Sequence, residues 1–132
     1  MIRGPHSDEQ LALVERQIAI WTAGVDSVGA LDDWTADGVL TAPRGVRLQA
    51  SEVMGVIEGW HREFCDLRIE LTSLVSSADG AWLAIEWTWN VTRRSDGKSS
   101  AMLDAIIVEL ADGLIVEWRE YFDTFDSVEF DT

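Results

Sequence analysis

The chain has 132 residues, of which 47% are hydrophobic and 26% charged, a composition typical of one soluble globular domain. Its formal net charge of −14 argues against nucleic acid and anionic membranes as partners, because their phosphates require patches of lysine and arginine. A single cysteine, Cys65, and two distant histidines, His6 and His61, match no disulfide or metal-ligand spacing, so we expect neither metal nor cofactor.

The sequence reads as one domain over residues 1–132, without an internal repeat or a linker. The opening residues, MIRGPHSDEQ, lack the apolar stretch of a signal peptide, and no apolar run is long enough to cross a bilayer. We therefore expect a cytoplasmic protein. The acidic tail 124–132 contains three apolar residues and is expected either to cover an opening or to fray.

Three helices are predicted in the first half of the chain, where apolar residues recur at helical spacing. The first begins at Ser7, which forms a capping-box pattern with Gln10. A shorter helix over 26–34 follows, and Ser51 is expected to cap the third, which ends at Phe64. The predicted inward-facing residues are Leu11, Val14, Ile18 and Trp21, then Val28, Leu31 and Trp34, then Val53, Ile57, Trp60 and Phe64.

After residue 65 the apolar residues alternate with polar ones, a pattern typical of strands with one buried face. Strands are predicted at 66–73, 81–92, 101–110 and 114–123, joined by short turn sequences. The earlier segment 36–45 reads as a turn, a short extended piece and a second turn. Helices followed by an antiparallel meander favour an α+β fold, with the helices packed on one face of the sheet.

The turn sequences predict how these strands pair. A two-residue hairpin turn at 96–97, with the sequence DG, places Trp89 opposite Asp104. A three-residue loop at 111–113 then places Asp104 opposite Glu120. The same register predicts the pairs Trp87–Ile106, Val91–Met102, Ile106–Trp118 and Met102–Phe122.

One face of this predicted sheet is apolar except for two acids, Asp104 and Glu120. A slip of one residue would move Glu120 to the other side. The apolar face carries Trp87, Trp89, Val91, Met102, Asp104, Ile106, Val108, Val116, Trp118, Glu120 and Phe122. The opposite face mixes Glu86, Thr88, Asn90, Glu109, Glu117, Arg119, Tyr121 and Asp123 with Leu103, Ala105, Ile107 and Ile115.

Two neighbouring carboxylates cannot both ionise cheaply in an apolar recess lined by tryptophan. One is expected to keep a proton with a raised pKa while the other stays anionic, so that the pair supplies a general acid and a general base. The Trp89 indole N–H would fix which oxygen is free. In the alternative interpretation, Asp104 is a structural acid bonded to an indole or to a helix N-terminus.

The final hairpin, DAIIVELADGLIVEWREYFD, and the segment WTADGVLTAPRG resemble the SnoaL-like branch of the nuclear transport factor 2-like superfamily. The resemblance covers nearly the whole chain. It implies a cone-shaped α+β fold of three N-terminal helices packed on a curved, mainly antiparallel sheet. This fold hosts isomerases, dehydratases, cyclases, epoxide hydrolases and non-catalytic binders, so the resemblance does not select a reaction.

The motifs of individual relatives match only in part. WREYFD resembles the limonene epoxide hydrolase motif and places its base at Glu120, but the companion arginine and aspartate fall at Trp87 and Trp89. In ketosteroid isomerases the base falls at Ala42 of this chain, whereas the protonated pocket aspartate falls near Asp104. The shared element is an apolar cone with one or two buried acids and no metal.

We therefore expect Asp104 and Glu120 to be catalytic residues in a pocket for a small apolar or aromatic cyclic molecule. The reaction would be of isomerase, cyclase, dehydratase or hydrolase type, without cofactor. The alternatives are a non-catalytic ligand-binding module and an interaction module. The resemblance also implies a homodimer through the outer sheet face. The expected pocket residues are Trp21, Trp60, His61, Trp87, Trp89, Met102, Ile106, Trp118 and Phe122.

Overall fold

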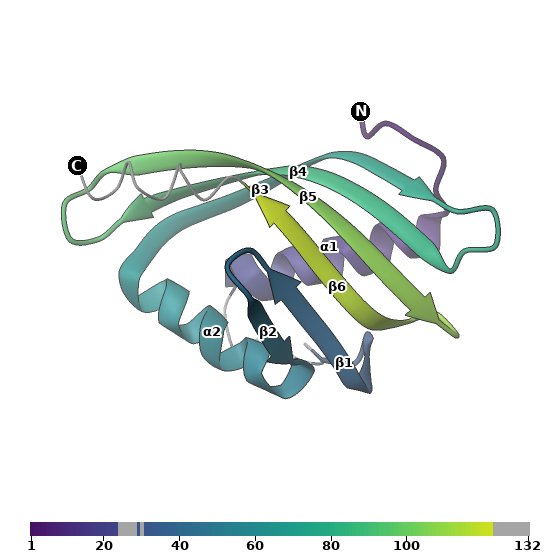
Figure 1. Cartoon of the computed structure of the whole chain (residues 1–132). Coiled ribbons are helices and arrows are strands. Elements are labelled where there is room, and N and C mark those ends of the chain that lie inside the picture. The colour runs from purple at the N-terminus through teal and green to yellow at the C-terminus, as the bar shows by residue number, and fades with distance from the viewer. Residues whose placement is uncertain (24–28, 30, 123–132) are drawn as a thin grey trace.

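The computed structural model of the protein describes residues 1–23, 29 and 31–122. Within these residues the chain forms two helices and six strands (Figure 1). In chain order they are α1 (Asp8–Ala23), β1 (Trp34–Ala42), β2 (Val46–Gln49), α2 (Ala50–Glu63), β3 (Phe64–Ser76), β4 (Trp82–Arg93), β5 (Ser99–Ala111) and β6 (Leu114–Phe122).

All six strands form one sheet in the order β2-β1-β6-β5-β4-β3. Neighbouring strands are antiparallel except β1 and β6, which are parallel. The sheet is curved, and both helices lie beneath its concave face (Figure 1). This confirms the expected α+β fold with helices covering one face of a mainly antiparallel sheet. No helix among the described residues is long and apolar enough to span a membrane.

The first helix begins as predicted. The Ser7 N–H donates to the Gln10 side chain at 2.8 Å, and the Gln10 N–H donates to the Ser7 hydroxyl at 3.1 Å, which completes a capping box. Gln17 is buried on this helix, where its side-chain oxygen accepts a hydrogen bond from the Trp34 indole at 3.0 Å. This bond links α1 to the first residue of β1.

Two helix predictions need correction. Gln49, not Ser51, caps α2, because the Glu52 side chain accepts a hydrogen bond from the Gln49 N–H at 2.9 Å and the helix begins earlier. Four positions of the predicted helix over 26–34, namely 26–28 and 30, lie outside the described residues, as does the tail 124–132. Its described residues 29 and 31–33 form turns and not a helix. At its described end, Trp34 begins a strand and pairs with Ile115 of β6.

The predicted register between β4 and β5 is wrong by two residues. Asp104 pairs with Trp87, and Trp89 pairs with Met102. The connecting loop is longer than a two-residue turn, since the Arg93 N–H donates to the Lys98 carbonyl at 2.8 Å across it. A shift of two residues preserves the alternation of faces, so both tryptophans remain on the concave side with Asp104.

The register between β5 and β6 also differs from the prediction. Asp112 and Gly113 form a two-residue turn, and both have positive φ. A bulge next to this turn shifts the register between Glu109 and Leu110. Pairing then places Asp104 opposite Phe122, and Ile106 opposite Glu120, so the two acids are diagonal neighbours rather than direct partners. The bulge also turns Ile115 inward, where it is fully buried, although the sequence predicted it on the outer face.

Candidate functional site

A cavity of about 230 Å³ lies between the concave face of the sheet and the helices. This volume is below the roughly 300 Å³ at which drug-sized pockets begin, so the cavity suits a small ligand. Its lining is apolar apart from two carboxyl groups. The twelve residues that line it are Trp21, Leu40, Ala42, Val46, Leu48, Val56, Trp60, Trp89, Met102, Asp104, Glu120 and Phe122.

The two acids at this cavity are buried, with 6% of Asp104 and 8% of Glu120 exposed. Each is held by one indole from the layer of side chains behind the cavity. The Trp87 N–H donates to Oδ2 of Asp104 at 3.0 Å, and the Trp118 N–H donates to Oε1 of Glu120 at 2.8 Å. Trp87, and not Trp89 as the predicted register implied, therefore orients the Asp104 carboxyl.

Burial raises the pKa of Asp104 to about 9, repulsion from Glu120 adds to this rise, and the bond from Trp87 opposes it. Burial also raises the pKa of Glu120, against the opposing effects of the Trp118 bond and of Asp104. Oδ1 of Asp104 has no hydrogen-bond partner within the described residues, and the charge of Glu120 acts on the Asp104 carboxyl by repulsion. The pair therefore takes up protons more readily than two free carboxylates.

Three tryptophans form much of the apolar wall. The ring of Trp89 lies 5.3 Å from that of Trp21 and 5.5 Å from that of Trp60, at interplanar angles of 72° and 70°. The rings therefore meet edge to face and are not stacked in parallel. The Trp89 indole N–H is buried and has no partner among the described residues.

Of the expected pocket residues, some line the cavity, some lie behind its lining, and His61 lies elsewhere. Trp21, Trp60, Trp89, Met102 and Phe122 line the cavity together with the two acids. Three others lie behind the lining, almost fully buried: Trp87, Ile106 and Trp118.

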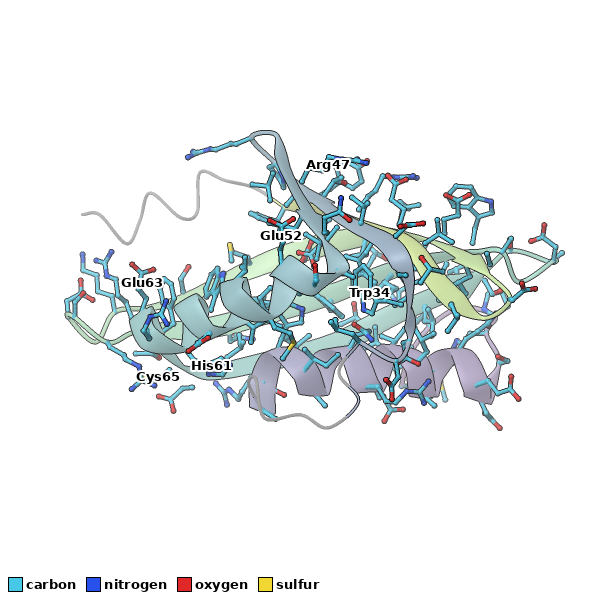
Figure 2. All side chains as sticks on the ribbon, turned by 90° about the horizontal axis from the view of Figure 1, so that it is seen from below. Trp34, Arg47, Glu52, His61, Glu63 and Cys65 are labelled. Atoms are coloured by element: carbon cyan, nitrogen blue, oxygen red, sulfur yellow. The ribbon has the colours of Figure 1, made fainter. Side chains whose placement is uncertain are left out.

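His61 does not line the cavity. It lies on the side of α2 that faces α1, and its Nε2 is 2.6 Å from the carbonyl oxygen of Trp21 (Figure 2).

Five lining residues were not among the expected pocket residues, although the resemblance to ketosteroid isomerases had placed their base at Ala42. Leu40 and Ala42 come from β1, Val46 and Leu48 from β2, and Val56 from α2. The sequence signal for the hairpin of β1 and β2 was the alternation of apolar residues in VLTA, residues 39–42, and in VRL, residues 46–48. It is short, and the parallel pairing of β1 with β6 that brings this hairpin over the cavity has no local sequence signature.

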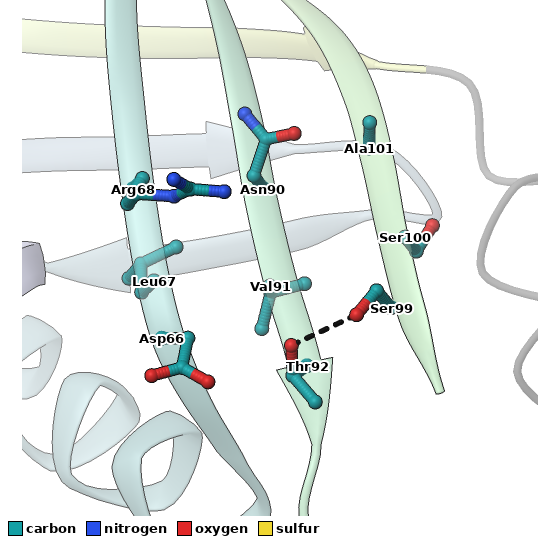
Figure 3. Close-up of a pocket in the computed structure, with 9 residues that line it drawn as sticks. All are labelled: Asp66, Leu67, Arg68, Asn90, Val91, Thr92, Ser99, Ser100 and Ala101. Carbon is teal, nitrogen blue, oxygen red and sulfur yellow. Dashed lines mark hydrogen bonds between the residues drawn. The ribbon is translucent and has the colours of Figure 1, made fainter. Parts of the chain in front are cut away.

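A second hollow, of about 600 Å³, lies where β3, β4 and β5 meet at one end of the sheet (Figure 3). Arg68, Asn90 and Ala101 cross it as a row on the face opposite the cavity. A bond between the hydroxyls of Thr92 and Ser99, 3.0 Å long, joins β4 and β5 there. Because this hollow is open to solvent, the apolar cavity with its two buried acids is the stronger candidate site.

No cluster of histidine, cysteine, aspartate or glutamate is placed to hold a metal ion in the part of the chain that the structure describes.

The profile of the SnoaL-like domain matches residues 14–118. No curated protein matches the sequence significantly. Among solved structures, a protein with a ketosteroid isomerase-like fold from Catenulispora acidiphila DSM 44928, in complex with trimethylamine, is 16% identical. It has a TM-score of 0.75 over 86% of this chain and 87% of its own.

Two further structures have related folds. An LEH-like epoxide hydrolase from M. tuberculosis is 19% identical, with a TM-score of 0.71 over 95% of this chain and 90% of its own. A proposed polyketide cyclase from Pseudomonas putida KT2440 is also 19% identical, with a TM-score of 0.72 over 94% and 98%. At such identities the likeness shows the fold and does not identify a reaction.

Proposed function

The chain belongs to the SnoaL-like family, and we propose that it binds a small, largely apolar molecule in its cavity and acts on it by cofactor-free acid/base chemistry. The observation that supports this proposal is the buried pair of Asp104 and Glu120 in the wall of an otherwise apolar cavity. Burying two neighbouring carboxyl groups is costly, so their presence beside a ligand-sized cavity favours a chemical role.

The environments of the two acids support one as the proton donor and the other as the proton acceptor. Asp104, with a pKa of about 9, keeps its proton at neutral pH and is suited to donate it to an oxygen of the ligand. Glu120, when ionised, would accept a proton from the ligand, with the Trp118 bond holding its other oxygen. Such an exchange fits isomerase, cyclase, dehydratase and hydrolase reactions.

The alternative is a non-catalytic module in which the cavity binds a ligand and the acids only orient it. The modest volume of about 230 Å³ fits a small ligand in either case. The three fold relatives support small-ligand binding, since they are described as an epoxide hydrolase, a proposed cyclase and a trimethylamine complex.

Binding of cyclic ketones, epoxides and aromatic acids, followed by ligand-observed NMR and turnover assays, tests the proposal. Asp104→Asn and Glu120→Gln keep the shape of each side chain but remove the acid. We expect both variants to abolish turnover of a ligand that binds the wild-type protein. Asp112→Asn and Glu86→Gln make the same chemical changes at exposed positions and serve as controls. Variants that alter only affinity would indicate the non-catalytic module.

A further inference from the structure

Among the residues that the structure describes, the two cavity acids have no positively charged partner. They are the only titratable groups among the twelve lining residues, and no salt bridge to either is found within the described part of the chain. The side chains that face them from α1, α2, β1, β2 and β4 are apolar or indole. Two buried carboxyl groups without a counter-ion lose the attraction that normally offsets their desolvation.

Hydrogen bonds at the pair nevertheless favour negative charge. One indole N–H donates to each carboxyl, from Trp87 to Asp104 and from Trp118 to Glu120. A donor to a carboxyl oxygen stabilises the ionised form, and both bonds oppose the rise in pKa that burial causes. The lining residues that the structure describes thus provide donors for carboxylates and no cation to balance them.

The walls around the pair suit an organic cation. The cavity contains the indoles of Trp21, Trp60 and Trp89, and indole attracts ammonium groups more strongly than other aromatic rings do. The formal net charge of −14 also raises the local concentration of cations over that of anions.

We propose that the ligand of this cavity carries a small alkylammonium group, a tertiary or quaternary amine, bound between the indole rings and the carboxyls of Asp104 and Glu120. The ammonium supplies the missing positive charge, and its alkyl substituents contact the apolar wall. This inference names the ligand class of the same cavity and rests on the small-ligand binding in the proposed function. With an ammonium group bound, Asp104 is ionised and acts as a charge partner and not as the proton donor.

A bound cation should displace a proton from the pair. In the free protein Asp104 holds its proton at neutral pH, because its pKa is about 9. A positive charge beside the carboxyls lowers that pKa, so binding releases a proton and becomes tighter as the pH rises toward 9. A neutral ligand that accepts a hydrogen bond from protonated Asp104 would bind less tightly over the same range.

Choline and 3,3-dimethyl-1-butanol form a matched pair of probes, since they differ in having a charged nitrogen or a neutral carbon at the branch point. Calorimetric titrations of the full chain at pH 6, 7.5 and 9, each in two buffers of different ionisation enthalpy, measure affinity and proton release. We expect choline to bind at least about tenfold more tightly than the alcohol, with a preference that grows with pH. Glu120→Gln should remove the preference, whereas Glu86→Gln should not.

The possible outcomes distinguish a failure of the ammonium assignment from a failure of the proposed small-ligand function. Equal or tighter binding of the alcohol, or choline binding without proton release, overturns the ammonium assignment and leaves the small-ligand cavity intact. Absence of binding by either probe and by the panel of cyclic ketones, epoxides and aromatic acids overturns both. Because the probe comparison uses the wild-type protein, a variant that fails to fold does not affect it.

Discussion

Asp104 and Glu120 are the residues on which the account depends, and the sequence placed both on the apolar face correctly. Alternation along a strand fixes the face of each side chain, and an error of two residues in register leaves that face unchanged. The contact partners were wrong for the same reason, because alternation carries no information about position along the neighbouring strand. For this reason the sequence predicted Trp89 as the donor to Asp104, whereas the structure has Trp87 in that position.

The raised pKa of Asp104 predicts how stability depends on pH. Between the unfolded value near 3.8 and the folded value of about 9, the folded state holds a proton that the unfolded state has lost. The free energy of unfolding should therefore fall as the pH rises from about 4 to about 9, by up to about 1.4 kcal/mol per pH unit for this proton. Urea unfolding of the wild type and of Asp104→Asn at pH 5 and pH 8 measures the effect.

The free energy of unfolding of Asp104→Asn minus that of the wild type should be larger at pH 8 than at pH 5. Comparing two proteins with otherwise equal surface charge cancels the general repulsion of an acidic chain. The exposed change Asp112→Asn should show no such trend. An identical pH dependence in Asp104→Asn and the wild type would mean that Asp104 is ionised in the folded protein.

The indole donors should each contribute to stability. Replacing Trp118 by Phe keeps much of the ring but removes the N–H that Glu120 accepts at 2.8 Å, which leaves a buried carboxyl oxygen without a donor. We expect a loss of about 1–3 kcal/mol in the free energy of unfolding, measured in urea. Trp82→Phe, at an exposed position, should cost distinctly less. Equal losses at the two positions would contradict a specific part for the Trp118 bond.

At the scale of elements, helices and strands were predictable where the apolar period was long, and connections were not. Ser7 and Gln10 form the expected capping box, and β3 to β6 occupy the expected segments. The loop after β4 was mispredicted, because the Arg93 side chain binds Asp96 and the strands close with a pair at Arg93 and Lys98. The parallel pairing of β1 with β6 was missed because it depends on contacts distant in sequence.

The contact between α1 and β1 should depend on Gln17. Its side chain accepts from the Trp34 indole at 3.0 Å and donates to Asp33 at 3.3 Å, and Asp33 in turn pairs with Arg16. Gln17→Ala removes a buried partner of two groups, and we expect about 1–3 kcal/mol of destabilisation in thermal or urea unfolding. Glu15→Ala, exposed on the same helix, is the control. A loss no greater than that of the control would show that these bonds contribute little.

At the scale of the whole molecule, none of the helices and strands in the described part of the chain covers the outer face of the sheet. Leu103 and Tyr121 are 80% and 55% exposed there, beside Ala105 and Ile107. We propose that a second copy of the chain covers this face, and sedimentation velocity should then show a dimer. Leu103→Asp should shift the protein toward monomer without changing its circular dichroism. A wild-type protein that sediments as a monomer at high micromolar concentration would contradict this proposal.

The central claim is that Asp104 and Glu120 form a proton-holding pair at the cavity. Carbon-detected NMR titration of the side-chain carboxyls, assigned with Asp104→Asn and Glu120→Gln, tests it most directly. The account predicts that both acids titrate above their ordinary values of 3.8 and 4.5, and that the resonance of Asp104 changes near pH 9. Titration of both carboxyls at or below those ordinary values would contradict it.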